Sequence, residues 1–407
     1  LKLDYLLDKA TYSLHEFITS MHIDGHKGLD LRGRMKSGRK MAVDVNSSLN
    51  DFPLSLVNIF LPKNTLSLKG GMDGNLFFKG NLKEPELSGE LAFKNAKVKV
   101  SLLSTEFGID SNRLDIRNGR LNFRNFKFIA PNNSALLLNG DLHFQPFDKM
   151  KANLVMSGRQ FQVVDVGSDE NSILSGKGFA DITARMRGYF KELDIRGSLK
   201  LLSGTEINYA VRENVLKEKG RLGDVVRFVS FRDSLNWEVS GGDKQFITSG
   251  FTMNMFMDIE KGVKMNIDLS ENGDNKVSLV GGGGLTYSID KNGISHLSGK
   301  YILSQGEVRY TIPVVAQKTF NISDGSYVEW TGDIVKPMLN ISASEYVKAN
   351  VISGNQSRLV TFNAIIRIGN TLADPSIAFD VEAVHDQVVQ SQLATLNKDE
   401  RSREAIN

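Results

Sequence analysis

The chain of 407 residues lacks cysteine, is poor in proline and histidine, and has no long apolar run. Without cysteine it can form no disulfide, but this fits an oxidising or a reducing compartment equally well. The longest apolar stretch, Leu54 to Leu61, is far shorter than the roughly 20 residues that a membrane-spanning helix needs. With 50 Lys and Arg against 47 Asp and Glu, and no basic patch with interleaved aromatics, nucleic acid is not an expected partner.

Motifs that carry chemistry are also missing. His22 and His26 lie four positions apart, but no glutamate completes a metalloprotease motif, so two surface histidines are the simpler interpretation. The glycine run at 281–284 is not followed by the Lys-Ser or Lys-Thr of a phosphate-binding loop, which favours a turn or a sheet bend. No nucleophile elbow, kinase set or dinucleotide fingerprint is found. The sequence therefore predicts a protein that is not an enzyme and that needs no metal or cofactor.

What the sequence does contain is a repeated alternation of apolar and polar residues. Leu91 and Phe93, for example, alternate with Glu90 and Lys94. A period of two is typical of strands with one apolar and one wetted face. Runs that are apolar on both faces are few, so an all-β protein built on an extended sheet with one dry face is predicted rather than a compact sandwich.

Local breaks in this alternation mark where strands end or bend. The phase slips at 95–96, as it does at a turn or a β-bulge. Pro85 favours a tight turn, because a central strand cannot spare its N–H group. Between Pro53 and Pro62 a short buried or edge segment is predicted. The clearest hairpin is expected at 251–269, where a three-residue loop would pair Ile259 with Val263 on one apolar face.

A short unit recurs along the chain. Each copy has an apolar residue, a glycine two positions later, and a small residue seven positions after that glycine, and the copies begin at Leu87, Ile195 and Leu297. A degenerate fourth copy contains Pro375 and Ile377. The irregular spacing of about 100 residues predicts a drifting β-repeat rather than a short-period solenoid.

The pattern divides the chain into five predicted segments. They are 1–50, the start of the sheet with a possible N-terminal helix; 51–211, a repeating β-segment; 212–250, a charged excursion or loop; 251–385, a second β-segment; and 386–407, a helical or frayed tail. The N-terminal helix rests on residues 1–20, whose apolar positions fit a helix face as well as a strand, and a short helix is favoured there.

The glycine units resemble the TamB family of Gram-negative envelope proteins. The family's recurring phrase, a glycine and a short strand followed by Gly…Pro-x-Leu-x-Gly-x-Leu, falls on Gly74, Gly80, Pro85, Leu87, Gly89 and Leu91. Weaker echoes are Ile195, Gly197 and Leu199, then Leu297, Gly299 and Tyr301, and the end of the family's C-terminal domain is similar to Gly369, Pro375, Ile377 and Phe379. The resemblance covers roughly 50–385, and the missing N-terminal membrane anchor and the charged tail fit a C-terminal fragment.

This resemblance implies a long, twisted, mostly antiparallel sheet folded lengthwise into an open groove, a β-taco with an apolar interior and few short helices. The family is expected to carry phospholipids between the inner and outer membranes and to work with an Omp85-family, TamA-like outer-membrane barrel. The full-length protein would be anchored in the inner membrane and reach the outer membrane through the periplasm. The expected function is therefore a lipid conduit. A scaffold or chaperone for outer-membrane protein assembly and translocation, and a purely structural spacer with a filled core, are the alternatives.

The methionines of 251–269 suit a mobile ligand because Met adapts to irregular partners, although ordinary core packing accounts for them equally well. The residues expected to line the groove are the apolar positions of the alternating strands. They are Leu76, Phe78, Leu91, Phe93, Val98, Val100, Leu121, Phe123, Leu136, Leu138, Leu154, Met156, Ile182, Met186, Leu199, Leu201, Phe251, Met253, Met255, Met257, Ile259, Val263, Met265, Ile267, Leu269, Leu285, Tyr287, Val308, Tyr310, Phe362, Ile366, Ile377 and Phe379.

Overall fold

A computed structural model describes most of the chain. The described residues are 2–7, 14–23, 26–36, 42–60, 66–81, 84–110, 113–145, 149–167, 174–210, 251–268, 276–310, 318–334, 336–353, 356–371 and 374–396. Within them, one sheet of 22 strands accounts for nearly all of the regular structure. The predicted excursion at 212–250 and the end of the tail lie outside these residues. The division into five segments stays a prediction.

The strands follow one another along the sheet in near-sequential order. The first half contains β1 Lys2–Leu7, β2 Leu14–Ile23, β3 His26–Lys36, β4 Ala42–Pro53, β5 Leu66–Asn81, β6 Glu84–Val100, β7 Thr105–Ile109, β8 Arg113–Arg117, β9 Arg120–Ile129, β10 Ala135–His143 and β11 Lys151–Val166. The second half contains β12 Leu174–Tyr189, β13 Asp194–Leu201, β14 Glu206–Ala210, β15 Thr252–Asp268, β16 Lys276–Ile289, β17 Ser295–Tyr310, β18 Lys318–Ile322, β19 Tyr327–Gly332, β20 Met338–Ser353, β21 Gln356–Thr371 and β22 Asp374–Ala383. The helices are the short 3₁₀ segments Leu54–Phe60, Ser101–Leu103 and Phe190–Glu192, and α1 Gln387–Thr395.

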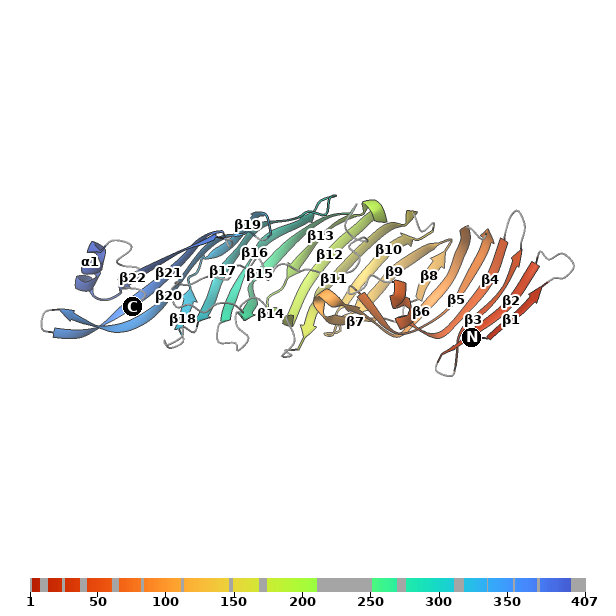
Figure 1. Cartoon of the computed structure of the whole chain (residues 1–407), viewed down its shortest axis with the longest axis horizontal. Helices are drawn as coiled ribbons and strands as arrows, with labels where there is room; N and C mark the ends of the chain where they lie inside the picture. Colours follow the sequence, from red (N-terminus) through yellow and green to blue (C-terminus); the bar gives the residue numbers. More distant parts are fainter. Residues whose placement is uncertain are drawn as a thin grey trace, which may run out of the picture.

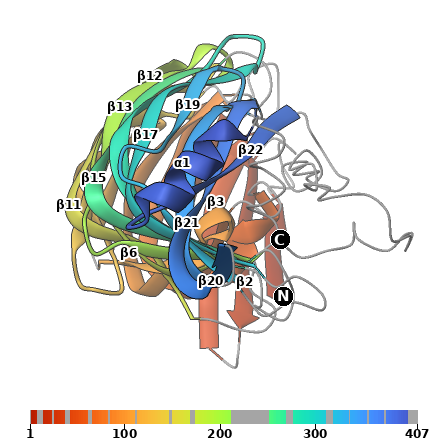
Figure 2. The same cartoon turned by 90° about the vertical axis from the view of Figure 1, so that its left-hand side faces the viewer.

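The molecule is elongated because each strand pairs with the next across the long axis (Figure 1). Strand β1 lies at one end of the sheet, and β22 with α1 lies at the other. Described neighbours pair antiparallel, except that β15 runs parallel to both β13 and β14. Viewed along the long axis, the strands curve strongly and α1 lies inside the curve (Figure 2). The expected all-β fold with one long, mostly antiparallel sheet is confirmed.

Three local predictions are wrong. The N-terminal helix is replaced by β1 and β2, whose register places Tyr5 opposite Phe17, so sheet pairing overrides the local helical pattern. The hairpin at 251–269 is one continuous strand, β15, which bulges between Ile259 and Val263 rather than turning back. The segment predicted to be buried or at an edge is a 3₁₀ helix, Leu54–Phe60, in which Leu54 is buried but Leu56 and Ile59 are 46% and 82% exposed.

Two further expectations are refined. Pro85 is the second residue of β6, opposite Gly80, rather than part of the turn. The glycine run at 281–284 lies inside β16, next to a register shift after Val280, so it forms an irregularity in the sheet and not a turn. None of the helices in the described part of the chain is both long and apolar enough to span a membrane.

The glycines of the repeat allow neighbouring strands to approach closely. A Cβ atom on Gly89 would lie 2.0 Å from the carbonyl oxygen of Asn75, one on Gly197 would lie 2.3 Å from that of Thr183, and one on Gly299 would lie 2.2 Å from that of Gly284. Gly89 and Gly299 also have positive φ angles of 147° and 125°. Because no side chain fits at these distances, the repeat marks points where the backbone of one strand crowds the next.

Single-residue bulges bend several strands and shift their alternation by one residue, so that the apolar residues before and after a bulge lie on the same face. Asp51, Asn125 and Gln160 have φ angles of 47°, 50° and 48°, and each lies beside a register shift. Each bulged N–H group donates to a side-chain oxygen of the neighbouring strand, to Asp73 at 2.7 Å, Asn139 at 2.7 Å and Asp181 at 2.8 Å respectively. The predicted slip at 95–96 is a further bulge, in which Asn95 has a φ of 46°. Bulges of this kind increase local twist and bend the strand.

The neighbours of Asp73, which accepts the N–H group of the bulged Asp51, shift the pKa of its carboxyl group. Burial alone would raise the pKa of its carboxyl group, but the Asp51 N–H group and the Lys94 ammonium, 2.7 Å from Oδ2, together lower the pKa below its ordinary value. A carboxylate whose pKa is lowered on folding stabilises the fold above its unfolded pKa of about 3.9, and this contribution is lost as the pH falls through the folded pKa.

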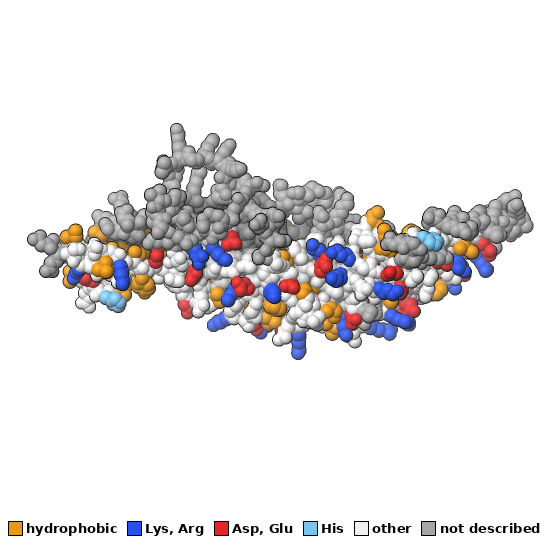
Figure 3. Space-filling view, turned by 90° about the horizontal axis from the view of Figure 1, so that it is seen from below, with side chains coloured by type: hydrophobic (Ala, Val, Ile, Leu, Met, Phe, Trp, Pro, Cys, Tyr) orange, Lys and Arg blue, Asp and Glu red, His pale blue; other side chains and the backbone are white. Residues whose placement is uncertain are grey.

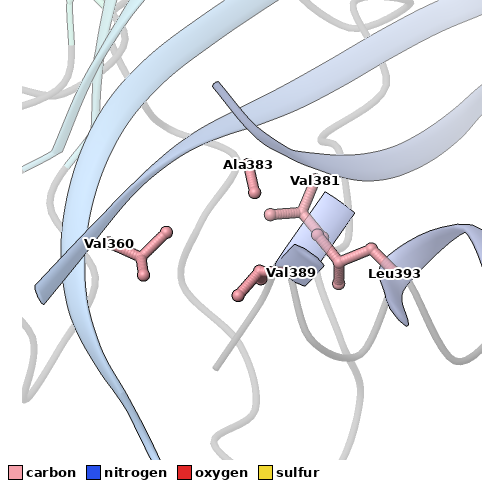
Figure 4. Close-up of a cluster of buried hydrophobic side chains, with 5 residues drawn as sticks. All are labelled: Val360, Val381, Ala383, Val389 and Leu393. Atoms are coloured by element: carbon pink, nitrogen blue, oxygen red, sulfur yellow. The ribbon is translucent and has the colours of Figure 1, made fainter. Parts of the chain in front are cut away.

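Within the tail that is predicted to be helical or frayed, Gln387–Thr395 form α1, which packs on one face of β21 and β22. Asp386 caps it by accepting a hydrogen bond from the Val389 N–H group at 3.0 Å. Val389 and Leu393 are buried against Val360 and Val381 (Figure 4). The helix therefore covers the last strands on the face to which Val360 and Val381 belong.

Replacing Gly89 with alanine should lower the unfolding free energy more than the same change at Gly80. Both glycines have positive φ, but a Cβ atom on Gly80 would meet nothing within 4 Å. The backbone cost of about 1–2 kcal/mol applies to both variants, and only Gly89→Ala adds a steric cost of about 1–3 kcal/mol. Urea denaturation of the two variants measures the difference, and equal losses would contradict the close-approach role.

Replacing Asp73 with alanine should destabilise the fold by about 1 kcal/mol at neutral pH, because the Asp51 N–H group loses its acceptor. The difference in stability from the unmodified chain should narrow as the pH falls below the unfolded pKa of about 3.9 and through the lower pKa of the folded carboxyl group. Thermal melting at pH 7 and pH 3 measures this gap. Asp44→Ala, which removes only an exposed ion pair with Lys79 at 3.9 Å, is the control. A gap that is constant with pH would argue against the charge contribution of Asp73.

Candidate functional site

Strand register brings the predicted apolar residues into continuous rows that run along the sheet. The best example crosses nine strands from β9 to β19 and consists of Phe128, Leu136, Gly158, Ile182, Leu199, Met257, Leu285, Gly299 and Trp330. Directly opposed residues lie on the same face of a sheet, about 4.5–5.5 Å apart. Every member of this row is apolar or glycine, so it forms an uninterrupted apolar stripe. We call the face that carries it the inner face.

Parallel rows widen this stripe. One consists of Phe123, Gly140, Leu154, Met186, Ile195, Met253 and Ile289, and the next of Phe126, Leu138, Met156, Ala184, Gly197, Met255, Tyr287 and Leu297. Another consists of Phe161, Ala180, Leu201, Ile259, Gly283, Tyr301, Val328 and Leu339. At one margin lie Ile207, Met265, Leu279 and Gly306, followed by Tyr209, Ile267, Val277, Val308 and Phe320.

The remaining predicted residues extend the inner face toward both ends. Leu76 and Leu121 belong to a row with Gly89, Ile116, Leu142 and Ala152. The other N-terminal pairs are Phe78 with Val45, Leu91 with Leu114, Phe93 with Met72, Val98 with Phe107 and Val100 with Leu66. In the C-terminal strands Phe362 faces Val347, Ile366 faces Phe379 and Ile377 faces Ile368, and Val263 continues into Gly281 and Leu303. Phe251 precedes β15, and Leu269 lies outside the described residues.

The opposite, outer face of the same strands is polar. One row reads Asn139, Val155, Arg185, Arg196, Asn254, Ser288 and His296. Another alternates in charge through Asp181, Lys200, Asp258, Gly284, Lys300 and Glu329. Figure 3 shows basic and acidic side chains interspersed along one side of the molecule. Side-chain polarity is thus sorted between the two faces over most of the sheet.

The inner face is filled unevenly by protein. Between β6 and β11, Phe107 stacks on Phe161 with 5.2 Å between ring centroids, and Phe126 makes edge contacts with Phe93, Phe123 and Phe128. This aromatic cluster is well packed. Along β12 to β15, by contrast, Met186, Leu199, Met253, Met255 and Met257 are half-buried, and Met265 is 39% exposed.

At the C-terminal end, α1 covers the inner face. Its partners Val360 and Phe362 share a strand face with Val347 and Val351 of β20, and that face continues into the buried cluster of Ala343 with Tyr301 and Leu303. Because α1 lies inside the curve of the sheet (Figure 2), the inner face is the concave one.

Charged groups on the outer face form ion pairs between neighbouring strands. The Lys200 ammonium, 2.7 Å from Glu260, and the Ser203 N–H group at 2.8 Å lower the pKa of the Glu260 carboxyl. This carboxylate sits at the β15 bulge and ties it to the turn after β13. Among the described residues no group of three or more His, Asp or Glu side chains could hold a metal ion.

Together the fold and the face define a class: an elongated β-protein with a long apolar face on one side of its sheet and a polar face on the other. None of the curated proteins matches the chain. The family model for the TamB C-terminal domain matches residues 124–397, and the chain belongs to the TamB family. This confirms the resemblance read from the glycine units. Proteins of this family are envelope-associated components of a translocation and assembly module in Gram-negative bacteria, are not enzymes, and function with an outer-membrane partner.

Sequence reasoning missed two parts of this surface. The first is the set of facing glycines, Gly140, Gly158 and Gly283, which are members of the rows although they are not apolar side chains. Their position two residues from large apolar residues was the available signal. The second is α1 as a cover for the inner face, which no local pattern indicates.

Truncating Phe107 should cost far more stability than truncating Met257. Phe107 is buried in the aromatic cluster, and a buried Phe→Ala change costs about 3–5 kcal/mol. Met257 is half-buried on a sparsely covered stretch, so Met257→Ala should cost less than about 2 kcal/mol. Urea denaturation of both variants tests this, and equal costs would show that protein fills the inner face evenly.

Proposed function

We propose that the inner face forms an open groove that binds phospholipid acyl chains, and that the chain is part of a conduit for phospholipids across the periplasm. The observation that carries this proposal is the set of apolar rows, which continue without a polar interruption across as many as nine strands while their middle members stay half-buried. Apolar surface left partly open along such a length favours an apolar ligand of matching length.

The energetics suit a ligand that moves. Burying one CH₂ group gains roughly 0.8 kcal/mol, so two acyl chains gain much from a continuous apolar face. A new strand comes about every 4.8 Å, and each presents nearly the same apolar surface as the last. A lipid sliding along the rows therefore exchanges equivalent contacts, and no single side chain holds it in one place.

The outer face supports the same role. Its alternating charges, including the ion pair of Lys300 with Glu329 at 3.4 Å, keep that side wetted in an aqueous compartment such as the periplasm. The acyl chains would be held on the concave side, and the phospholipid headgroups would remain in water at the open margin. We further propose that the outer-membrane partner is an Omp85-family barrel and that the conduit connects to the inner membrane.

A scaffold for outer-membrane protein assembly is the second candidate function. It is favoured by an unpaired strand edge: among the described residues the pairs of β20 with β18 and β19 end at Ser344, and from Tyr346 to Ser353 the strand pairs with β21. An open edge can pair with a strand of another chain. The scaffold function depends on the free edge of β20, whereas the lipid conduit depends on the inner face.

Photo-crosslinking on the two faces separates these functions. A photoreactive residue at Met255 or Met265 should yield phospholipid adducts, and one at the neighbouring Asn254 or Lys264 on the other face should yield few. The reason is that adjacent strand residues point to opposite faces. Lipid extraction and mass spectrometry of the purified full chain give the readout. Equal labelling on both faces would overturn the conduit, and protein adducts along the β20 edge without lipid adducts would favour the scaffold.

A further inference from the structure

The β20–β21 hairpin breaks the rule that the outer face is polar. Tyr346, Ile352 and Leu359 are 65%, 78% and 63% exposed. Register places Asn350 opposite Leu359 and Ile352 opposite Ser357, so Ile352 and Leu359 are diagonal neighbours on one face. Large apolar side chains elsewhere on the outer face, such as Phe256, stand among polar row neighbours.

The other face of this hairpin is already occupied. Val351, Val360 and Phe362 pack against α1. The helix therefore lies on the face opposite Ile352 and Leu359 and cannot cover them. We call residues 346–353 and 356–360 the tip ribbon. It is thus a two-stranded ribbon with large apolar side chains on both sides, one side covered by the protein's own helix and the other exposed, with Lys348, Asn350 and Ser357 among them.

Position and charge indicate what the bare side meets. The tip ribbon reaches the end of the long axis opposite β1 (Figure 1). Between Tyr346 and Val360 the sequence contains two cations, Lys348 and Arg358, and no acidic residue. Arg358 pairs with Asp386 at 3.0 Å. Lys348 is exposed on the same face as Ile352, and no ion pair joins it to another residue in the part of the chain that the structure describes. A tyrosine, two aliphatic residues and a lysine on one side suit the boundary between lipid headgroups and acyl chains.

We propose that the tip ribbon docks on the surface of a phospholipid bilayer, with Ile352 and Leu359 in the interfacial zone and Lys348 among anionic headgroups. This inference rests on the proposed conduit, because it supplies the contact through which lipid passes between the inner face and a membrane. The bare side of the ribbon presents exposed apolar side chains, and a bilayer that receives or supplies the proposed cargo would cover them.

The lack of cysteine in the chain gives a direct test. An environment-sensitive fluorophore is attached to Ile352→Cys or, as a matched control, to Phe256→Cys, since Phe256 is 49% exposed on the outer face of β15. The full chain is mixed with vesicles of phosphatidylethanolamine and phosphatidylglycerol. We expect a blue shift and an intensity rise at position 352 alone. Flotation should show a bound fraction lower by at least about fivefold for Ile352→Glu with Leu359→Glu, since charged side chains are costly at that depth. Phe256→Glu should float like the unmodified chain.

Each outcome decides something. Lipid adducts at Met255 with no response at position 352 would overturn membrane docking and leave the conduit intact. A response at 352 with no lipid adducts at Met255 would leave the docking and overturn the conduit. Binding that is equal for all variants would overturn the role of the ribbon. Protein adducts at position 352 in envelopes, without a vesicle response, would assign the ribbon to a protein partner instead.

Discussion

Every structural property of this chain depends on keeping strand register in phase across a long sheet. Because side chains alternate faces with a period of two, a slip by one residue in any strand would move its apolar set to the wetted side. The rows through Leu199, Met257 and Leu285 stay in phase across the change from antiparallel to parallel pairing at β13 and β15. Phase, more than any single contact, separates the two faces.

Two kinds of local feature allow the sheet to curve while its strands stay in register. Glycines such as Gly89 and Gly299 let backbones approach to distances that no Cβ atom would allow. Bulges at Asp51, Asn125 and Gln160 bend strands, and a polar side chain of the next strand satisfies each displaced N–H group. The sheet can therefore curl around its long axis while its apolar rows remain continuous.

The sequence predicts the alternation well, because period two is a local property of strands such as β6 and β15. It misassigns Glu260 to Gly262 as a hairpin loop, since a bulge and a tight turn use the same polar and glycine residues, and only the partners Gly281 and Gly283 on β16 decide between them. The parallel pairing of β15 and the cover that α1 provides depend on contacts between distant segments. No local pattern encodes those contacts, so that part of the inner face emerges only from the structure.

The bulges also determine where the chain can tolerate changes in length. Deleting one residue within a regular strand would invert the faces of the side chains in the rest of that strand, so that its polar residues would point to the inner face. At the bulge of Gln160 the backbone already absorbs one extra residue, at the bulge of Glu260 it absorbs two, and the ladder on either side is in phase. We therefore expect insertions and deletions that keep the apolar rows of the inner face continuous to occur only at these bulges and in the loops between strands.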